Sequence, residues 1–122
     1  MRIGVGVNIA YAVSAALLAL VLAFSGYGKL THAAAVVQNL DRTGVPRSWY
    51  PWLATAEFAG AAGLVAGIWL RPLGVAAAVG AALYFVGAVV THLVNNDAAG
   101  VRNPAPLLIV SIAVTTLGVL TV

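Results

Sequence analysis

Three titratable residues lie within or at the edge of long apolar segments, where ionisable side chains are rare: Lys29, Glu57 and His92. An acid inside an apolar helix is costly to bury, so it normally faces other helices and has a partner there. Glu57 therefore predicts either a structural contact, as an ion pair or a protonated carboxyl, or a group that exchanges protons. Lys29 can pair with Glu57 or extend its ammonium to the surface. His92 can donate a hydrogen bond between helices or relay protons beside an acid.

Several other kinds of chemistry are excluded by the residue content. The chain has no cysteine, so it supplies no thiolate nucleophile, no zinc–thiolate site and no iron–sulfur ligand. Neither a catalytic triad of serine, histidine and aspartate nor a phosphate-binding or dinucleotide-binding loop is present. No ligand spacing connects Glu57, His92 and Asp97, and we predict no metal site. Lys29, Glu57 and His92 remain as the catalytic candidates, with the reaction unassigned.

The composition indicates where these residues must be placed. The chain has 122 residues, of which 62% are hydrophobic and only 7% are charged. Soluble domains carry about 25% charged residues because their surfaces are hydrated. This composition excludes a soluble enzyme, a disordered chain and a nucleic-acid-binding domain, and it predicts an integral membrane protein. We attribute the net charge of +3 to topology and to contact with anionic lipid headgroups, not to a nucleic-acid partner.

The apolar runs predict four membrane-spanning helices in a single domain over residues 1–122, because about 20 apolar residues cross a bilayer as a helix. We place these spans at approximately 5–28, 52–70, 73–94 and 104–122. Residues 15–22 are continuously apolar and do not alternate as a barrel strand would. The first run is longer than a signal-peptide core of about 7–15 residues, so we expect it to remain as the first span.

The connecting segments predict the bundle's orientation and surface. Residues 32–43 have apolar positions at helical spacing and predict a short amphipathic helix on the membrane surface. Arg71 and Pro72 form a turn so short that the second and third spans must be antiparallel neighbours. The basic residues mildly favour a cytoplasmic first loop. Four aromatic residues are predicted at the membrane interfaces: Trp49, Tyr50, Trp52 and Trp69.

Four antiparallel spans bring the catalytic candidates together. The end of the first span, the start of the second and the end of the third share one membrane face, so Lys29, Glu57 and His92 should lie at similar depth. We expect four further polar residues at the rim of this cluster: His32, Asn95, Asn96 and Asp97.

The order of these motifs resembles the DoxX family, in particular its short DoxX-like members. The resemblance is carried by residues 24–30, by the acid and small residues of 56–64, by the turn at 71–74 and by His92. It implies a compact four-helix membrane bundle with Lys29, Glu57 and His92 as the family site. Some DoxX-type proteins are linked to thiosulfate:quinone oxidoreduction and to membrane oxidoreductase complexes. Without cysteine, this chain cannot carry sulfur in that way.

Three functions follow as hypotheses. The first is a subunit or accessory of a membrane redox system, because apolar walls, interfacial aromatics and a Lys/Glu/His cluster suit a quinone headgroup. The second is a structural or assembly subunit in which Glu57 only stabilises the fold. The third is a small proton-coupled transporter. Enzymatic activity is left open. We expect a multi-pass protein of the plasma or inner membrane, with the lipid bilayer and a membrane complex or a second copy as partners.

Overall fold

The computed structural model describes residues 2–122, with side chains described from residue 4 onward, and that range is helical without a strand. The all-α prediction is therefore confirmed. The elements in chain order are α1 (Arg2–Leu30), α2 (Ala34–Arg42), the 3-10 turn η1 (Arg47–Trp49), α3 (Tyr50–Ala66), α4 (Arg71–Val94), the 3-10 turn η2 (Ala98–Arg102) and α5 (Pro104–Leu120).

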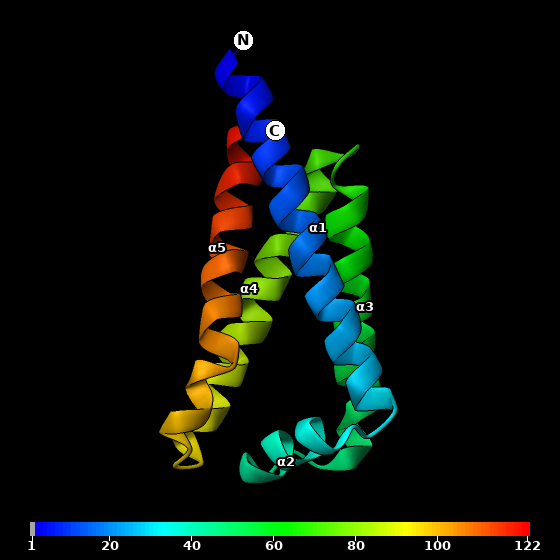
Figure 1. Ribbon diagram of the computed structural model, residues 1–122, viewed down its shortest axis with the longest axis vertical. Helices are drawn as coiled ribbons and strands as arrows, with labels where there is room; N and C mark the ends of the chain where they lie inside the picture. The colour runs from blue at the N-terminus through cyan, green and yellow to red at the C-terminus, as the bar shows by residue number, and fades with distance from the viewer. Residues whose placement is uncertain (1) are drawn as a thin grey trace.

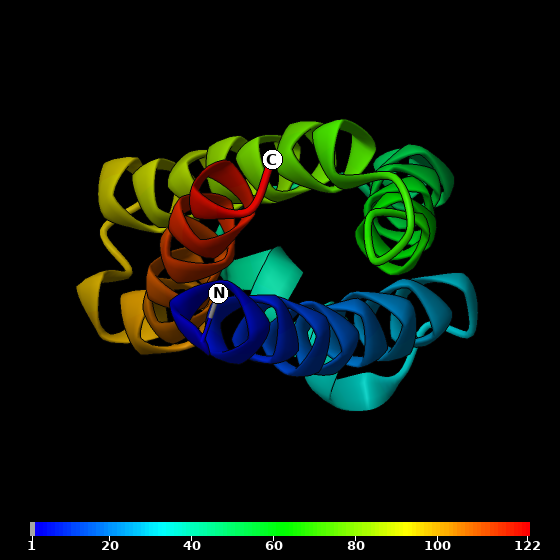
Figure 2. The same ribbon diagram turned by 90° about the horizontal axis from the view of Figure 1, so that it is seen from above.

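Four long helices pack around a common interior, and the fifth lies across one end. Contacts join α1 to α3, α3 to α4, α4 to α5 and α5 back to α1. Seen from above, the four helices follow one another in that order, and α2 is visible beneath them (Figure 2). In Figure 1 the α1–α3 pair and the α4–α5 pair are close together near the chain ends and separate toward α2.

The outer surface of this arrangement is apolar, as a lipid environment requires. Three segments are long and apolar enough to cross a membrane: Gly4–Leu30, Arg71–Val94 and Ala98–Leu120. Large apolar side chains on their outer faces, such as Phe24, Leu83 and Ile109, are exposed. In a soluble protein such a continuous apolar surface would be an aggregation hazard. These helices therefore indicate a membrane protein surrounded by lipid.

The end of the bundle opposite α2 is tightly packed. Gly67 at the end of α3 lies against the backbone of Gly74 in α4, and the Tyr11 hydroxyl contacts both positions. The guanidinium of Arg71 lies 4.0 Å from the centre of the Tyr11 ring and bonds to Thr121 at the end of α5. Small residues allow helix backbones to approach this closely. This contact brings all four long helices together at one end.

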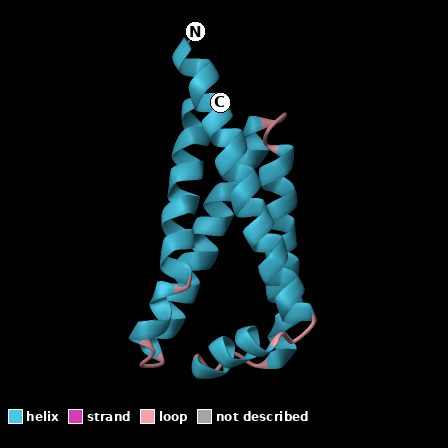
Figure 3. Ribbon diagram, viewed as in Figure 1, coloured by secondary structure: helices cyan, strands magenta, loops and turns pink. Residues whose placement is uncertain are grey.

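The predicted helix boundaries differ from the observed ones mainly in the second span. We placed that span at 52–70, whereas α3 begins at Tyr50 and ends at Ala66. Residues 67–70 form a turn in which Ile68 donates to the carbonyl of Val65 and Trp69 to that of Ala66. The chain turns early because the Gly67–Gly74 contact holds the start of α4 directly beside the end of α3. Figure 3 shows how short the loops between the helices are.

The amphipathic helix is also shorter than predicted. It occupies Ala34–Arg42 within the predicted 32–43, and none of its residues is buried. Gly44 follows with a φ of +72°, a left-handed conformation that glycine adopts without strain. This residue reverses the chain after α2 and directs it toward α3.

Candidate functional site

The first pair of the candidate site links α1 to α3. The Nζ of Lys29 lies 2.7 Å from Oε1 of Glu57, and both side chains are buried. Lys29 also donates to the Oγ of Ser25, one helical turn earlier, at 2.8 Å. The sequence allowed Lys29 either to pair with Glu57 or to extend its ammonium to the surface. In the structure, Lys29 pairs with Glu57. A buried pair of this kind requires close geometry to offset the loss of hydration.

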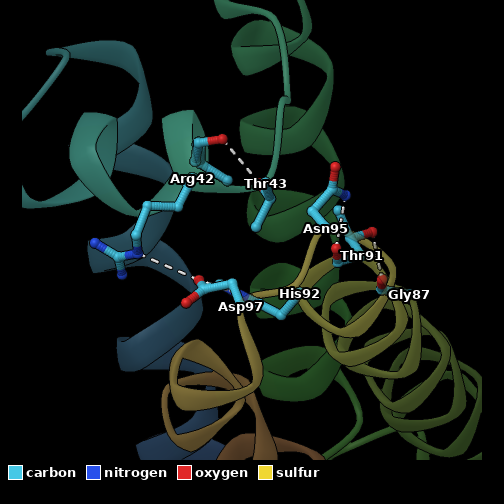
Figure 4. A network of polar contacts seen from close by, with 8 residues as sticks. Arg42, Thr43, Gly87, Thr91, His92, Asn95 and Asp97 are labelled. Atoms are coloured by element: carbon cyan, nitrogen blue, oxygen red, sulfur yellow. Dashed lines mark hydrogen bonds and ion pairs between the residues drawn. The ribbon is translucent and has the colours of Figure 1, made fainter.

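The second pair joins α4 to the turn that follows it. The Nδ1 of His92 lies 2.8 Å from Oδ2 of Asp97, and Nε of Arg42 in α2 lies 3.2 Å from the same oxygen. The close view in Figure 4 shows Asp97 between the two partners. The hydrogen bond from His92, helped by Arg42, holds the pKa of the Asp97 carboxyl below its ordinary value of 3.8 against the opposing effect of burial. Asp97 therefore carries a negative charge near neutral pH.

A cavity of about 540 Å³ lies between these two pairs. Its lining comes from all five α-helices and includes Lys29, Glu57 and His92. The remaining wall is mostly apolar and contains Leu40, Leu53, Phe85, Ala88, Pro104 and Leu107. Ligand sites of this size commonly combine apolar walls with a few well-placed polar groups. The separation of the two helix pairs toward α2 makes room for it (Figure 1).

The comparison with protein-family models assigns the chain. The model of the DoxX-like family matches residues 13–114, which is most of the sequence. The chain belongs to the DoxX-like family. The match contains α2, α3 and α4 and most of α1 and α5, so the whole cavity lies within it. Neither the curated proteins nor the solved structures include a match to this chain.

Of the four predicted rim residues of this DoxX-like protein, Asp97 contacts the site and the other three lie outside the cavity wall. Asp97 contacts His92 directly, as described above. Asn95 and Asn96 are exposed; Asn95 donates to the carbonyl of Thr91, and Asn96 has a φ of +59° in the turn. His32 is exposed between α1 and α2, and its ring lies 5.3 Å from that of Tyr50. None of these three is in the cavity wall.

The four aromatic residues predicted at the membrane interfaces differ in how exposed they are. Trp52 and Trp69 have exposed fractions of 77% and 81%, and Trp49 is half exposed with one side in the cavity wall. Tyr50 differs, because only 1% of it is exposed. Tyr50, directly after the η1 turn, is buried with its ring beside that of His32, whereas Trp49 and Trp52 remain exposed. Among the described side chains, the Tyr50 hydroxyl is the one buried polar group without a hydrogen-bond partner.

Several residues of the site were not among the predicted site residues. Arg42 lies in the segment predicted as an amphipathic helix, and its side chain reaches Asp97. Tyr84 lies in the cavity wall beside Glu57. Its spacing to His92 through Ala88, at intervals of four residues, places all three on one helix face and was the available signal. Gly100 had no sequence signal; an added Cβ there would collide with both His92 and Asp97.

The arrangement can hold a ligand by its polar end without a metal. Across residues 4–122 no cluster of three or more His, Asp or Glu side chains has the geometry to hold a metal ion. Lys29 uses two of its three N–H donors on Ser25 and Glu57, which leaves one for a ligand. His92 uses Nδ1 on Asp97, and Nε2 has no partner among the described residues. The cavity thus combines a free donor, a free ring nitrogen and apolar walls.

Proposed function

We propose that this DoxX-like membrane protein is a subunit or accessory of a quinone-linked redox system, and that its cavity binds the quinone headgroup. The observation that carries the proposal is the cavity of about 540 Å³ with Lys29, Glu57 and His92 in a mostly apolar wall. A quinone head is a flat apolar ring with polar oxygens on opposite sides. The free N–H of Lys29 suits one oxygen, and His92, which also lines the cavity, suits the other.

A second cavity supports the same ligand class. It has a volume of about 380 Å³ and lies between α3 and α4, with small residues such as Gly60, Ala77 and Gly80 in its wall. Glu57 and Tyr84 line both cavities. A long apolar chain attached to a headgroup in the first cavity would have an apolar path along α3 and α4 toward lipid. Membrane quinones carry such a chain.

We further propose that α3 crosses the membrane together with the three longer segments, as a multi-pass protein of the plasma or inner membrane. α3 has 17 residues and packs beside α1 and α4 over its length. The α2 end carries Arg42, Arg47 and Arg102, and this excess of basic residues favours a cytoplasmic position. The quinone site would then lie at the cytoplasmic side of the bilayer.

The main alternative is a structural role for the Lys29–Glu57 pair. The pair itself favours it, because each partner satisfies the other between α1 and α3. A proton-coupled transporter receives less support. Between the α2 end and the Tyr11–Arg71 end, the large buried side chains are mostly apolar and include Leu18, Leu22, Leu64 and Val114. A polar site at one end of the bundle agrees better with binding of a ligand than with transport of a substrate across the membrane.

The experiment measures quinone binding to purified protein in nanodiscs. A short-chain ubiquinone analogue is titrated while tryptophan fluorescence is recorded, since Trp49 lies in the cavity wall and quinones quench nearby indoles. We expect saturable quenching in the wild type and at least about tenfold weaker binding in Glu57→Gln, because Lys29 loses the carboxylate that orients its remaining N–H toward the ligand. The matched control is Asp41→Asn, which removes an exposed acid in α2.

A double variant separates binding from stability. Lys29→Met with Glu57→Leu replaces the ion pair by apolar side chains, which often preserves or raises stability. We expect this variant to keep its helical circular dichroism and to lose quinone binding. The proposal is wrong if the wild type shows no saturable quenching, or if the folded double variant binds as tightly as the wild type. The second result would support the structural role.

A further inference from the structure

His92 and Asp97 form a second polar group that the quinone proposal leaves without a specific role. His92 is in the cavity wall with only 4% of its surface exposed, and its Nδ1 is held by the Asp97 carboxylate. Asp97 is held in turn by Arg42 from α2, as Figure 4 shows. A carboxylate behind a histidine orients the ring and selects which nitrogen carries the proton.

The chemistry of this contact determines the tautomer of His92. An ionised carboxylate accepts hydrogen bonds and donates none, so the proton of a neutral imidazole must lie on Nδ1. Nε2 then carries a lone pair, and no described residue donates to it. Within the cavity wall, His92 therefore offers a hydrogen-bond acceptor.

The charges around the cavity favour a neutral ligand. Lys29 and Glu57 neutralise each other at 2.7 Å, and Arg42 and Asp97 do so at 3.2 Å. These two ion pairs therefore contribute no net charge that would attract an anion or a cation. Two of the functions that face the cavity are the remaining N–H of Lys29 and the lone pair of His92 Nε2. They match a neutral molecule that has both an accepting oxygen and a hydroxyl group.

We propose that the cavity is selective for the hydroxyl-bearing, reduced form of its ring ligand, a hydroquinone, whose O–H donates to Nε2 of His92. Asp97 is a positioning residue that holds this tautomer, and Arg42 holds Asp97 in place. The inference rests on the proposed quinone site and specifies which redox form that site prefers. It also connects the preference to the docking of α2, because Arg42 belongs to that helix.

Gly100 provides an independent means of disturbing this contact. It is buried in η2, and a Cβ at this position would collide with Oδ2 of Asp97 and Nδ1 of His92. Both atoms belong to side chains that can move, so alanine should separate the two groups while the helices remain in place. Gly100→Ala therefore changes the Asp97–His92 geometry without changing either residue.

The test compares trimethylhydroquinone with its dimethyl ether, bound anaerobically to the protein in nanodiscs and measured by isothermal titration calorimetry. The two probes share ring and oxygens, but only the first has O–H donors. We expect the wild type to prefer the hydroquinone by about tenfold, as one hydrogen bond to a buried acceptor allows. In His92→Phe the preference should disappear, and His92→Gln, whose side-chain carbonyl also accepts, should recover part of it.

Asp97→Asn is the decisive variant. An asparagine amide can donate to Nδ1, so Nε2 can become the protonated nitrogen. We expect trimethylhydroquinone and its dimethyl ether then to bind about equally. We also expect trimethylquinone, which accepts hydrogen bonds but donates none, to bind more tightly. Gly100→Ala should weaken the preference in the same direction, and Asp41→Asn should leave it unchanged. A merely structural role of Asp97 would weaken all probes equally and would not alter the ratio.

Two results would overturn the inference. One is equal binding of hydroquinone and ether by the wild type, and the other is an unchanged preference in folded Asp97→Asn. Both leave the quinone site itself intact if the ubiquinone analogue still binds and the Lys29/Glu57 double variant still loses it. If no ring probe of any kind binds saturably, the proposed function fails, and this inference fails with it.

Discussion

At the scale of single residues, this protein concentrates its chemistry in two buried or half-buried contacts. Lys29 with Glu57, and His92 with Asp97, each consist of one group on a long helix and one partner that offsets the cost of burying it. The sequence identified Lys29, Glu57 and His92 as unusual because charge inside an apolar segment is costly. It left the partners of these residues open, because pairing depends on how each helix is rotated about its own axis.

The Lys29–Glu57 contact leads to a stability prediction. Glu57→Gln leaves the Lys29 ammonium buried without its counter-ion, and breaking one partner of a buried pair costs about 3 kcal/mol. We therefore expect a clearly lower melting temperature in thermal unfolding followed by circular dichroism in detergent. The Lys29→Met and Glu57→Leu double variant should recover most of the loss. Equal melting of wild type and Glu57→Gln would show that the pair contributes little.

The lowered pKa of Asp97 makes a prediction for acid pH. Because the folded carboxyl has a pKa below 3.8, its contacts with His92 and Arg42 are fully present above that pH and are lost only as the pH falls through the lower folded value. NMR of the side-chain carboxyl carbon should give a pKa below 3.8 for Asp97. His92→Phe removes the hydrogen bond that contributes most to the shift, so the pKa should rise. An Asp97 pKa at or above 3.8 in the wild type would contradict the contact.

At the scale of elements, helix packing is controlled by where side chains are small enough. Gly67 has ordinary helical angles, with a φ of −64°, so a larger residue is excluded there by space and not by backbone conformation. Gly67 and Gly74 belong to rows of small residues at four-residue spacing in the second and third spans, which predict close helix contacts, and the structure pairs these two positions directly. The early end of α3 follows from it.

Two glycine variants test this packing. Gly67→Ala should destabilise the protein by about 2 kcal/mol, because the added methyl must displace the Gly74 backbone or the Tyr11 hydroxyl. The matched control is Gly80→Ala in α4, where nothing lies within 4 Å of the new Cβ. Alanine should there be neutral or stabilising by up to about 1 kcal/mol through its helix propensity. Thermal unfolding of the two variants in one detergent compares them, and equal effects would argue against the close contact.

At the scale of the whole molecule, the two helix pairs are close together at one end and separate at the other. The tight contact among Tyr11, Gly67, Gly74 and Arg71 closes the first end, and the cavity with α2 beneath it occupies the second. The polar groups that could bind a ligand lie at the second end. The asymmetry explains why one face of the bundle, and not its centre, is the candidate site.

The proposed four crossings can be measured directly, because the natural chain has no cysteine to interfere. Single cysteines replacing Asp41 and Asn96 should react with a membrane-impermeant maleimide from the same side of the membrane. A cysteine replacing Leu70, in the turn between α3 and α4, should react from the opposite side. Labelling of the Asp41 and Leu70 positions from the same side would mean that α3 does not cross. Labelling of the first two in inside-out vesicles would place the α2 end in the cytoplasm.

The sequence by itself determined the helical class, the membrane environment and the approximate extent of the helices. These depend on composition and on local runs of apolar residues, which any segment carries without reference to the others. Only the tertiary structure decided that Lys29 meets Glu57, that His92 meets Asp97 and Arg42, and that Tyr50 points inward. Each of these depends on contacts between residues far apart in the chain, and on helix rotations that the close packing at Gly67 and Gly74 helps to set.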